Sequence, residues 1–463
     1  MFIKRLEHRG KYYVYDVNSN MLTSISKQLF DELENNVFLS ENKEFITLYE
    51  KGYFHEYGLK EIYNPFTEKI RYLNDRNLSY FIFQVTQGCN LRCAYCPYSQ
   101  SNDLTRHHNN LNMNWNVAKK AMDFYAKHSV DSNFIGIGFY GGEPLINMEL
   151  IRQIVEYTKN VFEGKEVHFS ITTNLTLLTE EIMQYLEDNK FQLLISLDGN
   201  KEATDTNRKF INDKLSVFDK VIEKIKFIYD KHTRLFKQSA LNMVLDPKLS
   251  LDLYDDLLNQ YDFISEMNLY AVKKDDTYSD KKDVISADFI DSYNYKMFLC
   301  YLEILDGFNF GRETKLFQSQ KRLLQNELNE KSYMEIPNDV EEISTTSGVC
   351  LPGMTKTFVS INGDFYPCER VNENLKDMII GHVNVGYCNS GLKNFLNFNT
   401  KFKNRCLHCF AMRECNLCPE QFGVSGIESN KLSLDVCLEE QNKFIQILKD
   451  RIVYSEIRGM YYE

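Results

Sequence analysis

Short apolar segments alternate with amphipathic segments through the middle of the chain, and this alternation limits the possible fold more than any other feature. Six apolar segments have the length and composition of strands; they span residues 80–86, 134–140, 167–173, 191–198, 238–245 and 266–272. Helical spacing marks intervening segments such as 150–162 and 217–232. Repeated strand–helix units form parallel sheets with right-handed crossovers, so the sequence predicts an α/β fold with a partial (βα)6 barrel. Reactive groups gather at the carboxyl ends of such strands.

The chain of 463 residues is long enough for more than one domain, and we expect four parts. Residues 1–75 offer two short strands and two amphipathic helices, an order that suits a winged-helix-like module. A packing extension of the main domain explains the same pattern equally well. Residues 76–275 hold the barrel, 276–345 form a linker and helical bridge, and 346–463 form a cysteine-rich domain with a C-terminal helix.

Charge and hydropathy exclude several classes of protein. The net charge is −11, with basic residues interspersed among acidic ones, so we expect no nucleic-acid partner. The sequence has no signal-peptide pattern and no run of about 18 apolar residues, so we expect neither secretion nor a membrane span. The expected compartment is the cytoplasm, where cysteines stay reduced. Ligation of a metal or cluster therefore explains the twelve cysteines better than disulfides do.

Three cysteines follow the first barrel strand directly, in the segment CNLRCAYC at residues 89–96. A [4Fe–4S] cluster ordinarily takes one thiolate for each iron, so three cysteines leave one iron open. An open iron can chelate a small molecule through an amine and a carboxylate, and S-adenosylmethionine (SAM) is such a molecule. The spacing alone would also fit a zinc knuckle or a chance cluster, but its position after the first strand favours the iron–sulfur interpretation.

This motif consists of Cys89, Cys93 and Cys96 with the aromatic Tyr95 before the last cysteine, and it resembles the signature of the radical SAM superfamily. The resemblance implies that the three thiolates hold a cluster and that Tyr95 lies near the adenine of SAM. It also implies that the reduced cluster splits SAM into methionine and a 5′-deoxyadenosyl radical, which abstracts a hydrogen atom from the substrate. No general acid or base stands out in the sequence.

The segment FYGGEPL follows the second strand and resembles the family's GGEP motif, which binds the amino group of SAM. Adjacent glycines let a backbone edge approach a ligand closely, and a carboxylate beside them can accept hydrogen bonds from an amino group. The corresponding candidates are Gly141, Gly142, Glu143 and Pro144.

Three further positions correspond to the family by similarity. Ser196 and Arg208 match residues that contact the ribose and the carboxylate of SAM, and Asn174 fits the family after the third strand. Without the resemblance, Ser196 would be an ordinary strand-end serine and Arg208 a surface arginine.

The C-terminal part carries eight more cysteines, and seven of them form a recognisable pattern. The segment 350–368 has the pattern C-x12-G-x4-C, with an Asn-Gly pair at Gly363 that predicts a hairpin. The segment 406–418 reads C-x2-C-x5-C-x2-C, and a last cysteine follows after 18 residues. Two C-x2-C pairs alone would favour a zinc site with four thiolates. The cysteines are Cys350, Cys368, Cys406, Cys409, Cys415, Cys418 and Cys437.

The whole array resembles the SPASM extension of radical SAM enzymes, which holds two auxiliary [4Fe–4S] clusters. The resemblance assigns four cysteines to the outer cluster: Cys406, Cys409, Cys415 and Cys437. It assigns three to the inner cluster: Cys350, Cys368 and Cys418. The last pair is spaced x2 where the family has x3, and the family's additional upstream cysteine is absent from residues 343–349. Either Cys388 or Cys300 then completes the inner cluster, or one iron stays open for a substrate thiolate. Taken singly, each of these two cysteines is better explained as a small buried hydrophobic residue.

Enzymes with this combination of motifs mostly modify peptides or proteins. The leading hypothesis is a maturase that modifies a ribosomally made precursor peptide and forms an intrapeptide thioether crosslink. The N-terminal module would bind the leader peptide as an added strand, and a ferredoxin- or flavodoxin-type protein would supply electrons. One alternative is an anaerobic sulfatase-maturing enzyme, which forms formylglycine. The other is a non-catalytic binding protein stabilised by zinc.

Overall fold

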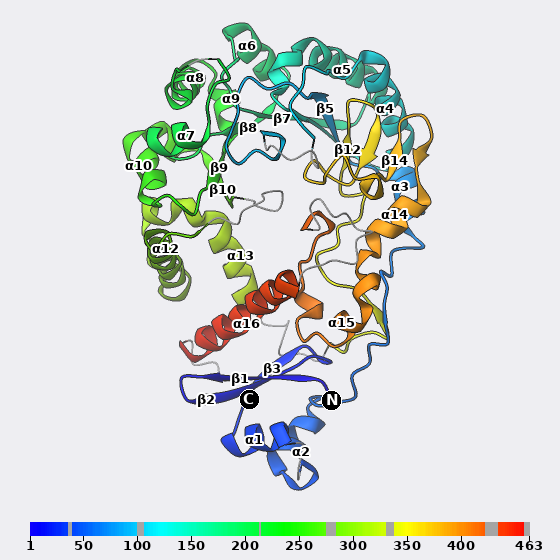
Figure 1. Cartoon of the computed structure of the whole chain (residues 1–463), viewed down its shortest axis with the longest axis vertical. Helices are drawn as coiled ribbons and strands as arrows, with labels where there is room; N and C mark the ends of the chain where they lie inside the picture. Colours follow the sequence, from blue (N-terminus) through cyan, green and yellow to red (C-terminus); the bar gives the residue numbers. More distant parts are fainter. Residues whose placement is uncertain are drawn as a thin grey trace.

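The structure is a computed structural model that describes residues 1–35, 39–99, 106–212, 214–274, 284–329, 338–421 and 434–457. Figure 1 shows the barrel in the upper part of the molecule, the C-terminal region beside it, and the N-terminal module below the long helix α16 (Leu434–Ile457). Among the described residues, no helix combines the length and apolar character that crossing a membrane requires.

Six parallel strands form the barrel and pair in chain order. They are β5 (Tyr80–Thr86), β6 (Phe134–Gly141), β7 (Glu166–Thr173), β8 (Gln192–Ser196), β9 (Ser239–Leu245) and β10 (Asn268–Lys273). The predicted partial (βα)6 barrel is confirmed, and the predicted strands match to within a residue or two at each end.

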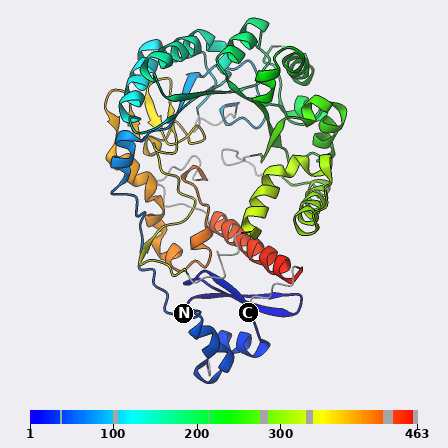
Figure 2. The ribbon, with the colours of Figure 1, turned by 180° about the vertical axis from the view of Figure 1, so that it is seen from behind.

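Helices form an outer arc around the strands, as Figures 1 and 2 show from opposite sides. They are α4 (Trp115–His128), α5 (Met148–Val161), α6 (Glu180–Asp188), α7 (Lys201–Asn207), α8 (Val217–Lys231), α9 (Thr233–Lys237), α10 (Asp252–Gln260) and α11 (Asp262–Ser265). Side-chain caps define where several begin: Asn114 accepts from Val117 N, and Ser216 accepts from Asp219 N. Such caps satisfy backbone donors that the first turn leaves unpaired.

The strands separate apolar from polar residues by their two-residue period. Along β9, Leu241 and Met243 are fully buried in the main hydrophobic core. Between them, Asn242 points to the opposite face and lines the interior cavities of the barrel. This alternation leaves the concave face of the sheet available for binding.

The C-terminal region continues the barrel sheet rather than forming a separate layer. Strand β12 (Thr357–Val359) pairs in parallel with β5, and β13 (Asp364–Tyr366) returns antiparallel to β12, which confirms the predicted hairpin at Gly363. Gly363 adopts a φ of +94°, which favours glycine. Further elements are β14 (Gly381–His382), β15 (Gly386–Tyr387), α14 (Asn389–Leu396) and α15 (Lys403–Leu407). The sheet has ten strands in all among the described residues.

The N-terminal module is a three-stranded antiparallel sheet followed by two helices. Its elements are β1 (Ile3–His8), β2 (Lys11–Asp16), β3 (Met21–Ile25), α1 (Lys27–Asn35) and α2 (Lys43–Glu50). Strand β1 was not predicted, because only Ile3 and Leu6 of its six residues are apolar. One small core, including Val14, Leu29 and Leu48, holds the helices to the sheet.

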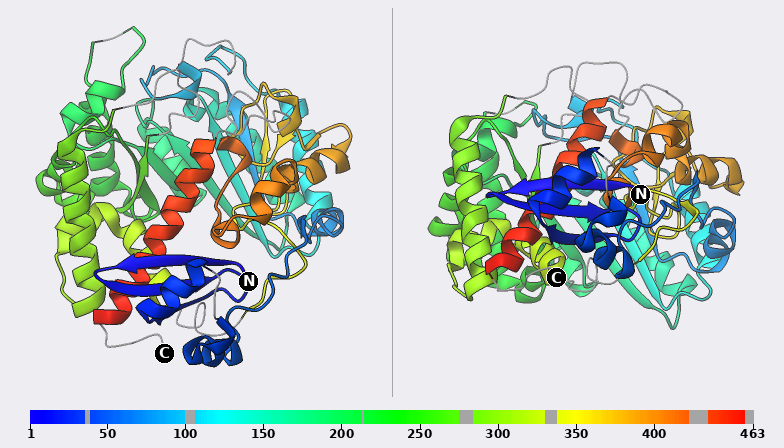
Figure 3. Two further views of the ribbon diagram at one scale, coloured as in Figure 1. Left: turned by 60° about the horizontal axis from the view of Figure 1, so that its bottom comes forward. Right: turned by 90° about the horizontal axis from the view of Figure 1, so that it is seen from below.

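The module also packs against α16, which lies across its sheet in Figure 3. Tyr15 meets Phe444 of α16 edge to face, with ring centroids 5.1 Å apart. Leu448 and Ile452 complete this contact. The N-terminal part therefore has a core of its own and is firmly docked on the C-terminal helix.

The remaining elements connect these parts. They are β4 (Glu61–Ile62), α3 (Ile70–Arg76), α12 (Ala287–Asp306), α13 (Gln318–Asn329) and β11 (Ile343–Ser344), which pairs with β4. Residues 275–283 and 330–337, which fall mostly within the predicted bridge, lie outside the described residues.

Candidate functional site

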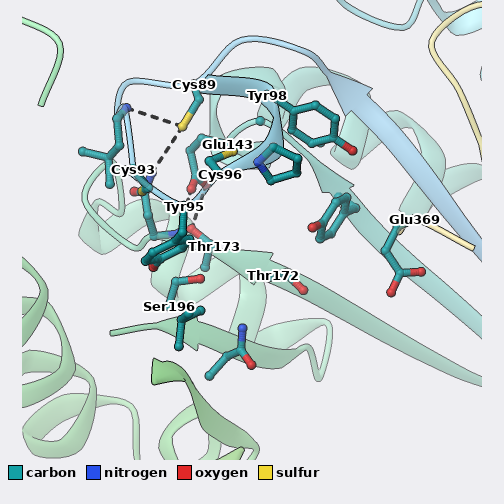
Figure 4. Close-up of a pocket in the computed structure, with 18 of the residues that line it drawn as sticks. Cys89, Cys93, Tyr95, Cys96, Tyr98, Glu143, Thr172, Thr173, Ser196 and Glu369 are labelled. Atoms are coloured by element: carbon teal, nitrogen blue, oxygen red, sulfur yellow. Dashed lines mark hydrogen bonds between the residues drawn. The ribbon is translucent and has the colours of Figure 1, made fainter. Parts of the chain in front are cut away.

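A cavity of about 570 Å³ lies at the carboxyl ends of the barrel strands (Figure 4). Ten of the residues predicted to bind the cluster or SAM line it: Cys89, Cys93, Tyr95, Cys96, Gly141, Gly142, Glu143, Asn174, Ser196 and Arg208. Pro144 is buried at the start of a short 3₁₀ helix (Pro144–Asn147) directly after Glu143. Residues at or just after the ends of four strands, β5 to β8, thus meet at one place with Arg208, which follows α7.

The two glycines join the ends of β5 and β6. Gly142 N donates to Thr86 O at 3.0 Å, and Glu143 N donates to Gly88 O at 2.8 Å. A Cβ atom on Gly142 would lie 2.0 Å from Gly88 O, and one on Gly141 would lie 2.1 Å from Thr86 O. We expected the glycines to admit a ligand. In the structure their close contact is with neighbouring backbone, and it sets the position of the cysteine segment relative to Glu143.

Glu143 has a buried carboxylate that accepts hydrogen bonds from three donors. It accepts from Leu145 N at 3.1 Å, Thr173 Oγ1 at 2.7 Å and Asn174 N at 2.8 Å. Burial raises its pKa to about 7, although these hydrogen bonds act in the opposite direction. The carboxylate is therefore held rigidly in a place where a bound amino group would favour its ionised form.

We expect SAM affinity to depend on pH through Glu143. The carboxyl group of Glu143 binds its proton more tightly in the folded protein than in the unfolded chain, where its pKa is 4.5. The SAM-free fold therefore loses stability as the pH rises from 4.5 through about 7. SAM binding that needs the carboxylate should strengthen over the same interval, by up to about tenfold per pH unit. Anaerobic calorimetry across this range should show the slope, and Glu143→Gln should reduce it. Equal slopes for both proteins would contradict the assignment.

Asn174 connects Glu143 to the cysteine segment. Its backbone N–H binds Glu143, while its side-chain Nδ2 donates to Asn90 Oδ1 at 3.0 Å and lies 3.9 Å from Cys89 Sγ. Its Oδ1 accepts from Thr176. The residue after the third strand therefore orients two parts of the site at once.

Arg208 is buried in an ion pair and is not a surface residue. Its guanidinium binds Asp198 through two hydrogen bonds of 2.8 and 2.9 Å. Asp198 also accepts from Tyr95 Oη at 2.5 Å and from Val244 N at 3.0 Å. Sequence reasoning missed Asp198, although it stands in the same ISLDG segment as Ser196 and directly follows a strand. This carboxylate holds the ring that we expect beside adenine.

Other cavity residues also went unnoticed in the sequence. Tyr140, Thr172 and Asn242 lie on inward-facing strand positions, and Glu369 follows Cys368 directly. Glu420, two residues after Cys418, lines the same cavity. These strand residues could have been found from the two-residue period of a strand, which places alternate side chains on the inner face of the barrel. The cavity thus extends from the first three cysteines to residues beside the inner set of C-terminal cysteines.

A second cavity of about 740 Å³ occupies the concave face of the barrel sheet. It shares lining residues with the first, including Tyr140, Asn242, Glu369 and Arg370. Lys356 also lines it and forms an ion pair with Glu369 at 2.9 Å. The two cavities together offer polar space for a substrate next to the cysteine segment.

The C-terminal cysteines fall into two spatial groups. Burial raises the pKa of Cys406 to about 12, and three neighbouring thiols raise it further: Cys415, Cys409 and Cys437. Burial likewise raises the pKa of Cys418 to about 12, with Cys368 and Cys350 among its charged neighbours. The structure therefore brings together the same two sets that the sequence comparison had assigned to the outer and inner clusters.

The two remaining cysteines lie elsewhere. Cys300 is fully buried in α12, beside Glu303 and two lysines. Cys388 is exposed at the start of α14, with its sulfur 3.0 Å from Ser390 Oγ. Neither is among the neighbours that influence Cys418 in the described part of the chain, whereas Glu420 is.

Hydrogen-bond donors lie beside two thiols of the outer group. Among the described residues, no group of three or more Cys, His, Asp or Glu side chains lies close enough to hold one metal ion. Arg405 Nη1 lies 3.3 Å from Cys437 Sγ and Gln441 Nε2 lies 3.4 Å from Cys409 Sγ, so N–H donors are ready to support thiolates.

Comparison with known proteins agrees with this geometry. Residues 83–260 match the model of the Radical SAM superfamily. They include the three cysteines of the segment 89–96, the Gly-Gly-Glu-Pro turn and the Asp198–Arg208 pair. The chain therefore contains a radical SAM domain at residues 83–260. This class implies a [4Fe–4S] cluster and SAM as cofactors, for which the residues of the first cavity provide the thiols and polar groups.

Two known proteins are similar to parts of this chain. The Cysteine-type anaerobic sulfatase-maturating enzyme of Clostridium perfringens is 30% identical over 136 residues, which is 28% of this chain and 36% of that protein. The Radical SAM cyclopropyl synthase TigE of Paramaledivibacter caminithermalis is 24% identical over 294 residues, 61% of this chain and 60% of that protein. The chain thus spans about a third of the first relative and less than two thirds of the second.

A solved structure shares the fold over most of the chain. Native anSMEcpe with bound AdoMet and Cp18Cys peptide has a TM-score of 0.57 at 20% identity. The superposition covers 82% of this chain and 99% of that chain. The match is therefore longer than the barrel alone.

Proposed function

We propose that this protein modifies a ribosomally made precursor peptide and forms a thioether crosslink within it. The observation that carries this proposal is the first cavity, which reaches from Cys89, Cys93 and Cys96 to Glu369 and Glu420. A substrate residue in that cavity would lie between the SAM cysteines and the inner C-terminal group. At the end with the SAM cysteines, a hydrogen atom would be abstracted from the substrate. At the end with the inner C-terminal group, the substrate thiolate would bind.

The two C-terminal groups would hold auxiliary [4Fe–4S] clusters in this proposal. The outer group provides four cysteines, but the inner group provides only Cys350, Cys368 and Cys418. Neither Cys300 nor Cys388 is among the charged neighbours of Cys418, so in this proposal one inner iron would be left for a substrate thiolate or for Glu420. This arrangement would hold the thiolate close to the carbon that reacts, which lowers the entropic barrier.

The proposed reaction is balanced with SAM as the oxidant. One electron from a ferredoxin- or flavodoxin-type protein cleaves SAM, and the resulting 5′-deoxyadenosyl radical removes one hydrogen atom from a peptide carbon. The peptide thiol loses its proton, and the thiolate bonds to the carbon radical. That bond formation releases one electron, which replaces the one supplied at the start. The products are methionine, 5′-deoxyadenosine, one proton and the crosslinked peptide.

The N-terminal module supports a peptide substrate. Its helices and α16 cover the two faces of its sheet, which leaves the edges of β1 and β3 as sites where a leader peptide could add a strand. Anionic and polar residues line the barrel, and a peptide backbone can satisfy them. All twelve cysteines are free, which suits the reducing cytoplasm that we propose as the compartment.

Sulfatase maturation is the second candidate. The similarity to a sulfatase-maturating enzyme and to its peptide-bound structure favours it. The three-stranded N-terminal module and the missing upstream cysteine count against it. The two candidates differ in product, because a thioether removes two hydrogens and one free thiol, whereas formylglycine formation removes the cysteine sulfur.

The test uses reconstituted enzyme with SAM and dithionite under anaerobic conditions. One reaction contains a short cysteine-rich peptide chosen from the reading frames next to the gene, and the other contains a cysteine peptide taken from a sulfatase. We expect the first peptide to lose two hydrogens and one alkylatable thiol per crosslink, while the second is unchanged. Formylglycine in the second peptide, with no crosslink in the first, would overturn the proposal.

A further inference from the structure

The second cavity has more cationic than anionic side chains in its wall. Its charged lining residues are three cations and one carboxylate: Lys237, Lys356, Arg370 and Glu369. The chain as a whole has a net charge of −11, so this surplus of positive charge is a local feature. It lies on the concave face of the barrel, where a substrate has room to bind.

The first cavity differs in its charge. Three carboxylates and two arginines line it: Glu143, Glu369, Glu420, Arg208 and Arg370. The charge of Arg208 is already balanced by Asp198 through two hydrogen bonds. SAM carries a sulfonium and an ammonium group but only one carboxylate, so a wall rich in carboxylates complements it. The positive charge of the second cavity is therefore not required for SAM and is available to another ligand.

An ion pair holds Lys356 in the wall of the second cavity. Its Nζ lies 3.0 and 2.9 Å from the two carboxylate oxygens of Glu369. The side chains of Lys356 and Glu369 are 32% and 19% exposed, so water screens this pair only in part. Glu369 lines both cavities, which places the ammonium group near their boundary. Since an ammonium group has three N–H donors, Lys356 can bind a ligand oxygen without releasing Glu369.

The cavity extends along the barrel strands towards their amino ends. Lys237 ends α9 just before β9 begins, so it lies near the edge of the sheet opposite the cysteine segment. Strand β9 has seven residues, which corresponds to a length of about 20 Å. An extended peptide covers that distance in about six residues. A peptide whose reacting residue lies beside the cysteine segment would therefore place nearby residues among the three cations.

We propose that the second cavity binds a carboxylate of the peptide substrate, within about six residues of the modified residue, through Lys356, Arg370 and Lys237. An aspartate or glutamate side chain and a C-terminal carboxylate offer the same chemistry, because each accepts charge-assisted hydrogen bonds from these cations. The proposal rests on the proposed function only in requiring a peptide substrate. It does not depend on which bond the enzyme forms.

The test is fluorescence anisotropy under anaerobic conditions, using the full chain with all clusters reconstituted and SAM present but no reductant. The probes are short synthetic peptides with one cysteine, an amidated C-terminus, and a glutamate at each position from one to six residues on either side of the cysteine. Matched peptides carry glutamine instead, with either an amidated or a free C-terminus. We expect at least one glutamate peptide to bind at least about tenfold more tightly than its amidated glutamine counterpart, because a hydrogen bond to a charged group is lost.

The peptide with the free C-terminus identifies the source of the carboxylate. If it binds as tightly as the best glutamate peptide, the cavity accepts the end of the chain as well as a side chain. If it alone gains affinity, the chain end is the ligand. Equal binding of all the peptides, or binding of none, would overturn the proposal.

Two variants separate a direct contact from a structural effect. Lys356→Gln should lose most of the tenfold preference for glutamate but bind the glutamine peptide within about twofold of the wild type. An equal loss of affinity for both peptides would indicate a structural role and would overturn the proposal. If Lys356→Gln does not fold, Lys237→Gln replaces an exposed lysine of the same cavity and should also reduce the preference.

Lys119→Gln is the matched control. Lys119 lies on the outer helix α4 and forms an exposed ion pair with Asp123 at 2.8 Å, so its replacement should leave the preference unchanged. The crosslinking reactions described above give a separate result. If the wild type binds the glutamate peptide as expected but modifies no peptide after reduction, the proposed function fails while the carboxylate site stands.

Discussion

Replacing Cys93 with alanine is expected to abolish the cleavage of SAM. Burial raises the pKa of this thiol to about 12, so its thiolate needs a strongly cationic partner, which an iron cluster supplies. Removing one of only three thiols should release the cluster. Because changes around a metal site that spare its ligands already cost about 10- to 100-fold, we expect a loss of at least about 100-fold. Chromatography of 5′-deoxyadenosine after dithionite reduction measures it.

Iron content and a matched cysteine variant provide the controls. Cys93→Ala should contain roughly four fewer irons per chain than the wild type. Cys388→Ala removes an exposed thiol at the start of α14 and should keep both iron and SAM cleavage near wild-type levels. Wild-type iron content and cleavage in Cys93→Ala would refute the assignment of the segment 89–96 as the cluster site.

The second large effect is expected for Gly142→Ala. The added methyl group would lie 2.0 Å from Gly88 O, a contact that neither backbone segment can keep. The Gly142–Thr86 and Glu143–Gly88 hydrogen bonds should break as the turn moves away, and overpacking of this kind costs about 1–3 kcal/mol. Because the same turn carries Glu143, SAM affinity should fall by at least about tenfold, which anaerobic calorimetry would detect.

Gly164→Ala is the control for Gly142→Ala, because it replaces a glycine by alanine without a steric clash. Gly164 also lies next to a helix end, has a φ of +81°, and would place its Cβ in open space. This variant should lose some stability from backbone strain but should bind SAM normally. Normal SAM binding by Gly142→Ala would show that the turn does not position Glu143.

Residue patterns predicted the elements of the barrel well because each strand carries its own apolar signal. The segment FQLLISLD at residues 191–198 marks β8 without reference to any other part of the chain. The strands of a parallel barrel end at one face, so the motifs after β5 to β8 had to meet there. Family resemblance added the part of SAM or of the cluster that each motif is expected to contact, which spacing alone does not reveal.

Strand pairs and ion pairs between residues far apart in the sequence could not be predicted in the same way. Nothing in the segment 357–359 indicates that it joins β5, which lies about 275 residues earlier. Arg106 and Glu373, which form a buried ion pair, are separated by a similar distance, and each resembles a surface residue when considered alone. The burial of Arg208 could not be predicted for the same reason, since burial of a charged side chain depends on a partner that only the fold supplies.

The docking of the N-terminal sheet has a consequence for damage by air. Phe410 and Ala411 pack into the contact between that sheet and α16, and they lie between Cys409 and Cys415 in the chain. Oxidative loss of a cluster bound at Cys409 and Cys415 would therefore loosen the contact on which the sheet rests. If that sheet binds the leader peptide as proposed, an enzyme inactivated by oxygen would also lose affinity for the peptide and would leave the precursor available to intact enzyme.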